Sequence, residues 1–119
     1  MKTLVIGASE NSNRYAYRAI KSLGINGHEV VGIASRRGQV DDVVFLTEQE
    51  PLEDIHTVTL YINPRIQGNY EDYIISLQPK RVIFNPGTEN GPFMKKLKQN
   101  GIVPVIACTL VMLNTNQYV

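Results

Sequence analysis

The 119-residue sequence is poor in cysteine, in long hydrophobic runs and in charge of one sign, and each absence excludes a class of protein. A single cysteine excludes an intrachain disulfide and a cysteine-rich zinc site. No apolar run reaches the roughly 18 residues of a membrane-spanning helix, and the apolar segment before Gly7 is too short for the core of a signal peptide. The formal net charge is +1, which leaves no electrostatic footprint for nucleic acid or an anionic membrane. We therefore expect a soluble, cytoplasmic protein.

The remaining composition is that of an ordinary globular domain. Hydrophobic residues make up 43% of the chain and charged residues 19%, which supplies one core and excludes a disordered chain. Valine and isoleucine are abundant, and β-branched residues favour buried strands. No repeat, linker or low-complexity segment divides the sequence, so we expect one domain over residues 1–119, without room for a separate substrate domain.

Apolar runs alternate with amphipathic stretches along the chain. Short apolar runs predict five buried strands, at residues 4–7, 30–34, 57–62, 81–84 and 102–107. Apolar residues at helical spacing predict helices at residues 15–23, 64–77, 91–100 and 109–114. Residues 35–55 are irregular apart from a short edge segment at 43–46, and residues 116–119 are interpreted as a tail. This alternation implies right-handed βαβ units. The predicted fold is α/β, a Rossmann-like three-layer sandwich with a mainly parallel five-stranded sheet.

The loop between the first strand and the first helix is the most informative segment. Such a turn lies at the carboxyl edge of a parallel sheet, where ligands of doubly wound folds bind. Gly7 permits a tight turn, free N–H groups at the helix start attract anions, and Arg14 can present forked donors to a phosphate. The dinucleotide fingerprint is not met, because Ser9 and Ser12 replace its second and third glycines. The alternative is a plain turn in which Ser12 or Asn13 caps the helix.

The end of the second strand carries two arginines instead of an acid. Domains that bind NAD usually place an acidic residue there to bind the ribose hydroxyls. Arg36 and Arg37 instead suit an extra phosphate on the ribose, either the 2′-phosphate of NADP or the 3′-phosphate of coenzyme A (CoA). The alternative is a solvated basic turn, with Asp41 and Asp42 available to pair with the arginines.

Two proline-containing turns follow the third and fourth strands. They comprise residues 63–65 and 85–87, and both should lie at the same sheet edge as Gly7. Their small and amide residues could bond to amide groups of a ligand. Asn-Pro and Pro-Gly are also strong turn formers in any protein, so turn chemistry alone explains them equally well.

These residues together resemble the small bacterial CoA-binding proteins. The segment 7–11, followed by Arg14 and Tyr17, is similar to the Gly-Ala-Ser-x-Asn loop of that family, whose members are Rossmann-like single domains similar to the CoA-binding domain of the succinyl-CoA synthetase alpha subunit. The resemblance continues at residues 27–30, 51–55, 85–90 and 101–106. The chain departs from the family pattern after the second strand, where Val-Asn-Pro is usual, and before Pro86, where Trp-x-Gln is usual. The resemblance implies a ligand-binding module without a reaction of its own.

Other motifs with catalytic associations are weaker. Tyr17 and Lys21 have the Tyr-x-x-x-Lys spacing of short-chain dehydrogenases, but they lie on the first helix, where such a pair is commonplace. No Gly-x-Ser-x-Gly elbow and no metal-ligand spacing are present, so we expect no metal and no catalytic residue. Cys108 is interpreted as a small buried apolar residue.

The sequence-based hypothesis is therefore a domain that binds CoA or an acyl-CoA through a phosphate-binding loop, without evident catalysis. The alternative is a small NADP-binding protein or reductase fragment. The residues leave open whether the CoA is free or acylated, and whether the chain forms a homo-oligomer or acts through a protein partner. The predicted ligand contacts are Gly7, Ala8, Ser9, Asn11, Asn13, Arg14, Tyr15, Ser35, Arg36, Arg37, Asn63, Pro64, Asn85, Pro86 and Gly87.

Overall fold

The short β-branched runs form one parallel sheet in the structure, a computed structural model that describes residues 1–119. Its strands are β1 (Thr3–Ile6), β2 (Val30–Ile33), β5 (Thr57–Leu60), β6 (Arg81–Phe84) and β7 (Val103–Ile106). They lie in the order β2-β1-β5-β6-β7, and every neighbouring pair is parallel. All residues of β1 and β5 are buried, as expected of strands covered on both faces, and they include the buried polar residues Thr3, Thr57 and Thr59. The predicted α/β, Rossmann-like fold is confirmed.

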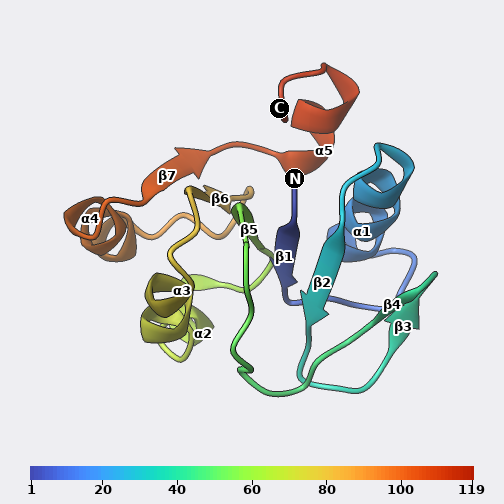
Figure 1. Cartoon of the computed structure of the whole chain (residues 1–119), viewed down its shortest axis with the longest axis horizontal. Helices are drawn as coiled ribbons and strands as arrows, with labels where there is room; N and C mark the ends of the chain where they lie inside the picture. The colour runs from blue at the N-terminus through green and yellow to red at the C-terminus, as the bar shows by residue number, and fades with distance from the viewer.

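Helices cover both faces of the sheet and complete three layers (Figure 1). One face carries α1 (Tyr15–Ile25) and α5 (Thr109–Asn114), and the other carries α2 (Pro64–Gln67), α3 (Glu71–Leu77) and α4 (Gly91–Gln99). Successive strand residues point to opposite faces, so Val5 packs with the α1 side while Leu4 and Ile6 pack with the α4 side. None of the helices is long and apolar enough to span a bilayer.

The helix expected over residues 64–77 is divided into two. Its first part, α2, ends at Gln67, with Gly68 as its C-cap, and α3 begins after Tyr70. Glycine has a low helix propensity, and here it marks the interruption. α2 lies near the carboxyl edge of the sheet because it follows β5 closely, and its Ile66 remains 43% exposed.

The segment 35–55 also contains more structure than expected. A small antiparallel hairpin pairs β3 (Gln39–Val40) with β4 (Val43–Val44), and Leu46 then forms a parallel bridge to Ile33 beside β2. Phe45 is buried, and it packs close to Gly32, where a side chain on the glycine would lie 3.2 Å from the ring.

The expected tail at residues 116–119 is wrong, because Tyr118 is packed into the domain and only 2% exposed. Its hydroxyl lies 2.6 Å from Oγ1 of Thr3, so the end of the chain closes the sheet edge where the strands begin. The two termini accordingly lie near each other in Figure 1.

Candidate functional site

The candidate site is a cleft of about 750 Å³ at the carboxyl edge of the sheet. From β1 the chain moves outward to β2, and it then returns to β5 on the other side of β1. The loops that leave β1 and β5 therefore diverge, and such a topological switch point is where open α/β sheets bind ligands. The cleft is lined by the segments that follow β1, β2, β5 and β6.

The cleft brings together most of the residues singled out from the sequence. Those that line it are Gly7, Ala8, Ser9, Asn11, Arg14, Tyr15, Ser35, Arg36, Arg37, Asn63, Pro86 and Gly87. Residues from four separate segments thus meet in one concave surface, as their positions after parallel strands predict.

Three of the predicted residues do not line the cleft: Asn13, Pro64 and Asn85. Asn85 is 3% exposed, and its side chain holds the fold together behind the cleft. Its Nδ2 donates to Oγ1 of Thr59 at 2.6 Å and to the carbonyl of Leu60 at 2.9 Å, while its Oδ1 accepts from the N–H of Thr109 at 2.9 Å. These bonds tie β5, β6 and the start of α5 together, and they leave the amide no free group for a ligand.

Internal hydrogen bonds shape the loop after β1. The N–H groups of Gly7 and Ala8 both donate to the carbonyl of Ile33 at 2.9 Å, which fastens the loop to the end of β2. Oγ of Ser9 accepts from the N–H of Asn11, and Oδ1 of Asn11 accepts from the N–H of Asn13. Both side-chain oxygens thus stabilise the loop itself.

Gly7 is required by the fold itself. Its φ is +92°, and a Cβ at this position would lie 2.9 Å from the carbonyl oxygen of Tyr61. Glycine therefore allows β1 and β5 to remain neighbours as the chain turns into the cleft.

The start of α1 opens onto the cleft with free donors. The N-cap is Arg14, and no side chain caps the helix, so the alternative in which Ser12 or Asn13 serves as the cap is wrong. The N–H groups of Tyr15 and Ala16, which line the cleft, have no acceptor within the protein. The first turn also contains no acidic residue, so the positive end of the helix remains available to an anion.

The arginines of the cleft have no acidic partner. None of the ion pairs in the structure involves Arg14, Arg36 or Arg37. Asp41 pairs with Lys21 at 3.0 Å, so it does not neutralise the arginine turn. Glu10 is the one carboxylate in a lining that holds three arginines, and the cleft therefore favours an anionic ligand.

Comparison with known proteins assigns the family. The family described as CoA binding domain matches residues 1–114. The chain belongs to this CoA binding domain family. It is similar to an uncharacterized protein of known crystal structure, with 49% identity, a TM-score of 0.96, and coverage of 98% of this chain and 97% of the other. The resemblance identified from the sequence is confirmed.

More distant solved structures share the fold. One is a hypothetical protein from Pyrococcus horikoshii, with 22% identity, a TM-score of 0.86, and coverage of 97% of this chain and 82% of the other. Another is a protein from Thermus thermophilus, with 18% identity, a TM-score of 0.86, and coverage of 98% and 90%. No curated protein matches the chain.

The part of this CoA binding domain's cleft that follows β5 and β6 contains no charged side chain, and most of its lining residues were not predicted from the sequence. Over the whole cleft, the lining residues that were not predicted are Glu10, Ala16, Ala34, Phe45, Tyr61, Ile62, Ile66, Tyr70 and Thr88. Ala34, Tyr61 and Ile62 directly follow strands, and that position could have indicated them. Ile66 lies in α2 and Tyr70 is the N-cap of α3, so the two lining residues flank the interruption of the helix.

Buried hydrogen bonds hold this side of the cleft in place. Gln67 is completely buried, and its Nε2 donates to the carbonyls of Ile62 and Thr88 at 3.0 and 2.7 Å.

Tyr61 also lines the cleft. Burial raises the pKa of Tyr61 to about 12, so its phenol remains neutral at physiological pH.

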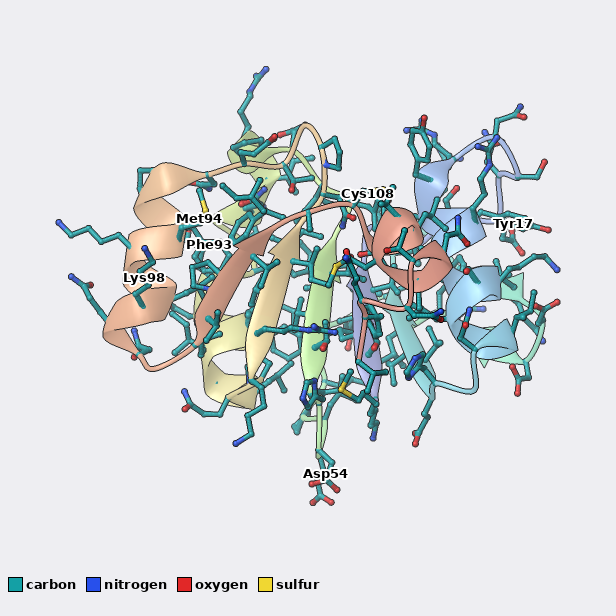
Figure 2. All side chains as sticks on the ribbon, turned by 90° about the horizontal axis from the view of Figure 1, so that it is seen from above. Tyr17, Asp54, Phe93, Met94, Lys98 and Cys108 are labelled. Atoms are coloured by element: carbon teal, nitrogen blue, oxygen red, sulfur yellow. The ribbon has the colours of Figure 1, made fainter.

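The residues considered for catalysis lie outside the cleft. The ammonium of Lys21 lies 5.5 Å from the ring centroid of Tyr17 and pairs with Asp41. Cys108 is partly buried at the N-cap of α5. In Figure 2 it lies at the sheet edge where the strands end, and Asp54 lies beyond the opposite edge. Neither Tyr17, Lys21 nor Cys108 lines the cleft.

Proposed function

We propose that this CoA binding domain binds CoA or an acyl-CoA in the cleft, and that it does so without catalysing a reaction. The observation that carries the proposal is the polarity of the cleft. Its arginines follow β1 and β2, whereas Ile62, Ile66 and Tyr70 follow β5. CoA has the same polarity, since an anionic nucleotide is joined to an uncharged pantetheine arm.

The residues after β1 and β2 fit the phosphates of CoA. The free N–H groups at the start of α1, together with the guanidinium of Arg14, would hold the diphosphate. Arg36 and Arg37 would hold the 3′-phosphate of the ribose. Both arginines are exposed, so water and salt will weaken these contacts.

The residues after β5 and β6 fit the pantetheine arm. Ile66 offers an exposed apolar surface. Oδ1 of Asn63 caps α2 by accepting from the N–H of Arg65, and the N–H of Gly87 donates to Glu89, so the side-chain Nδ2 of Asn63 is the donor that could bond to an amide of the arm. A volume of about 750 Å³ lies within the usual range for small-molecule sites, roughly 300–1,000 Å³. The lining contains no histidine or cysteine, and the raised pKa of Tyr61 disfavours acid–base chemistry by its phenol. We therefore propose binding alone.

The test is calorimetric titration with CoA, dephospho-CoA, NADP and NAD at one salt concentration. We expect CoA to bind most tightly, with about a tenfold preference over dephospho-CoA, equivalent to about 1.4 kcal/mol. Replacing both Arg36 and Arg37 with alanine should remove that preference and leave the melting temperature unchanged, because both side chains are exposed and unpaired. The matched control replaces Lys95 and Lys98, two exposed cations on α4 that line no part of the cleft.

Two results would contradict the proposal. Tighter binding of NADP than of CoA would favour the alternative, since the same arginines could hold a 2′-phosphate. Absence of binding by all four compounds would remove the nucleotide site altogether. Loss of the preference in the lysine control would mean that general charge, rather than the arginine turn, reads the phosphate.

A further inference from the structure

Glu10 occupies an unexpected place in the cleft, since it is the one acid among residues proposed to bind phosphates. It lies on the loop after β1, yet its side chain reaches the segment that follows β2. Its Oε2 accepts a hydrogen bond from the N–H of Gln39 at 2.9 Å. The carboxylate thus joins the two loops that carry the arginines.

Gly38 provides the space for this contact. A Cβ on Gly38 would lie 2.8 Å from both Cγ and Cδ of Glu10, closer than real Cβ contacts. Gly38 is not among the glycines with positive φ, so its backbone conformation does not require glycine. The missing side chain therefore serves the close approach of Glu10.

The turn that carries Arg36 and Arg37 has few other attachments. Residues 35–37 form no hydrogen bond with the rest of the protein. The turn is held at one end by Ala34, whose N–H donates to the carbonyl of Leu46 at 2.9 Å. At the other end, Gly38 accepts from the N–H of Phe45, and Gln39 donates to Glu10. The loop after β1 is thus bonded to the residues on both sides of the turn: to Ile33 through the N–H groups of Gly7 and Ala8, and to Gln39 through Glu10, the one side chain that makes such a link.

We propose that Glu10 is a positioning residue, which holds the Arg36–Arg37 turn against the loop after β1 so that the ribose phosphate and the diphosphate of one ligand are bound together. The inference rests on the proposed function: Arg36 and Arg37 contact the ribose phosphate, and Glu10 supports their discrimination between ligands with and without that phosphate by holding the turn in place. The hydrogen bond, and not the negative charge, performs this role, because a negative charge alone would repel the phosphate.

Calorimetry on three variants tests this separation of roles. Glu10→Ala removes the acceptor, and Glu10→Gln keeps an oxygen acceptor while removing the charge. A hydrogen bond of ordinary strength corresponds to about fivefold in an equilibrium. Glu10→Ala should therefore reduce the roughly tenfold preference for CoA over dephospho-CoA to about twofold. Glu10→Gln should retain it, and Glu53→Ala, the same change at an exposed glutamate outside the cleft, should leave it unaltered.

Gly38→Ala perturbs the same contact from its other side. The new methyl group should displace the Glu10 side chain and lower the preference in the wild-type background. In the Glu10→Ala background it should have no further effect on the preference, since the contact is already lost. The double-mutant comparison also cancels any effect of the nearby Phe45 ring, 3.0 Å from the added Cβ.

Amide hydrogen exchange of Gln39 in the ligand-free protein gives a readout independent of CoA. The exchange should become faster in Glu10→Ala and remain slow in Glu10→Gln. Unchanged preference in Glu10→Ala, or loss of it in Glu10→Gln, would overturn the inference while the proposed function stands. Wild-type protein that fails to bind CoA, or binds both ligands equally, would overturn both.

Discussion

The two ends of the sheet use arginine in opposite ways. At the end where the strands begin, Nε of Arg81 donates to Oγ1 of Thr57 at 2.9 Å, and its Nη2 donates to the carbonyl of Tyr118 at 2.6 Å. Its guanidinium also lies 4.5 Å from the ring centroid of Tyr118. At the end where the strands finish, Arg14, Arg36 and Arg37 have no ion pair and face a cleft.

The difference separates a structural arginine from arginines available for binding. The amino end is closed by the returning chain terminus, which supplies both the ring and the carbonyl that Arg81 requires. The carboxyl end has no such cover, because the loops diverge at the switch point. Perturbing the amino end should therefore change stability alone, and perturbing the cleft should change binding.

The largest expected effect is at the amino end. Tyr118→Ala should lower the free energy of unfolding by about 3 kcal/mol, because it removes a buried aromatic ring together with its contact to Arg81. Tyr118→Phe keeps the ring and loses only the bond to Thr3, at a cost of about 1 kcal/mol. Urea unfolding measures both changes, and the affinity of the folded protein for CoA should remain unaltered. A weakened affinity would show that the two ends are coupled.

Gly7 should show an intermediate effect that combines both properties. Gly7→Ala should lower the free energy of unfolding by about 2 kcal/mol through backbone strain and contact with Tyr61, and it should also weaken CoA binding. Gly27→Ala is the matched control, because Gly27 also has positive φ, at +82°, but an added Cβ would meet nothing within 4 Å. If Gly7→Ala lowered the free energy of unfolding no more than Gly27→Ala does, and bound CoA with the affinity of the wild type, the structure of the loop would be contradicted.

The smallest expected effect is a pH dependence at the amino end. Burial, followed by nearby positive charges, lowers the pKa values of His28 and His56. The unfolded chain therefore binds protons more readily than the native protein. The resulting stability is present above the ordinary pKa of 6.5 and is lost as the pH falls through the lowered values.

Melting temperatures between pH 7.5 and pH 5 measure this dependence. The melting temperature should decline with acidification, and His28→Gln should decline less steeply than the wild type. The variant that lacks Arg36 and Arg37 should decline as the wild type does, because its changes lie at the other end of the sheet. A melting temperature that rises on acidification would have the opposite sign and contradict the lowered pKa values of the two partly buried histidines.

Most of the architecture could be predicted from local patterns. Buried strands such as residues 57–60 are short runs rich in β-branched residues, and helices such as α4 have a proline near their start and apolar residues at helical spacing, so period and composition were sufficient. The order of strands and helices then implied a parallel sheet, and a parallel sheet assembles its loops at one edge. This logic is why residues as distant as Arg14, Arg36 and Gly87 could be grouped in advance.

Asn85, Gln67 and Tyr118 show where local patterns were insufficient. The spacing of Asn85 matched a ligand-binding turn, yet its amide is bonded to β5 and to the start of α5. Nothing in the sequence indicated that Gln67 would bond to the carbonyl of Ile62, or that Arg81 would donate to the carbonyl of Tyr118. In each case the partner lies on another element, and the choice between a ligand and a protein partner depends on long-range packing.

The sequence by itself therefore determined the five strands of the parallel sheet, most of the helices and the sheet edge at which the cleft lies, since these follow from periodicity and chain connectivity. Only the tertiary structure decided which polar side chains remain free at that edge. Glu10 contacts Gln39, Asp41 contacts Lys21, and the arginines between them have no partner. The physical reason is that a hydrogen bond or ion pair depends on a separation of about 3 Å between atoms, and folding alone sets that separation for residues distant in sequence.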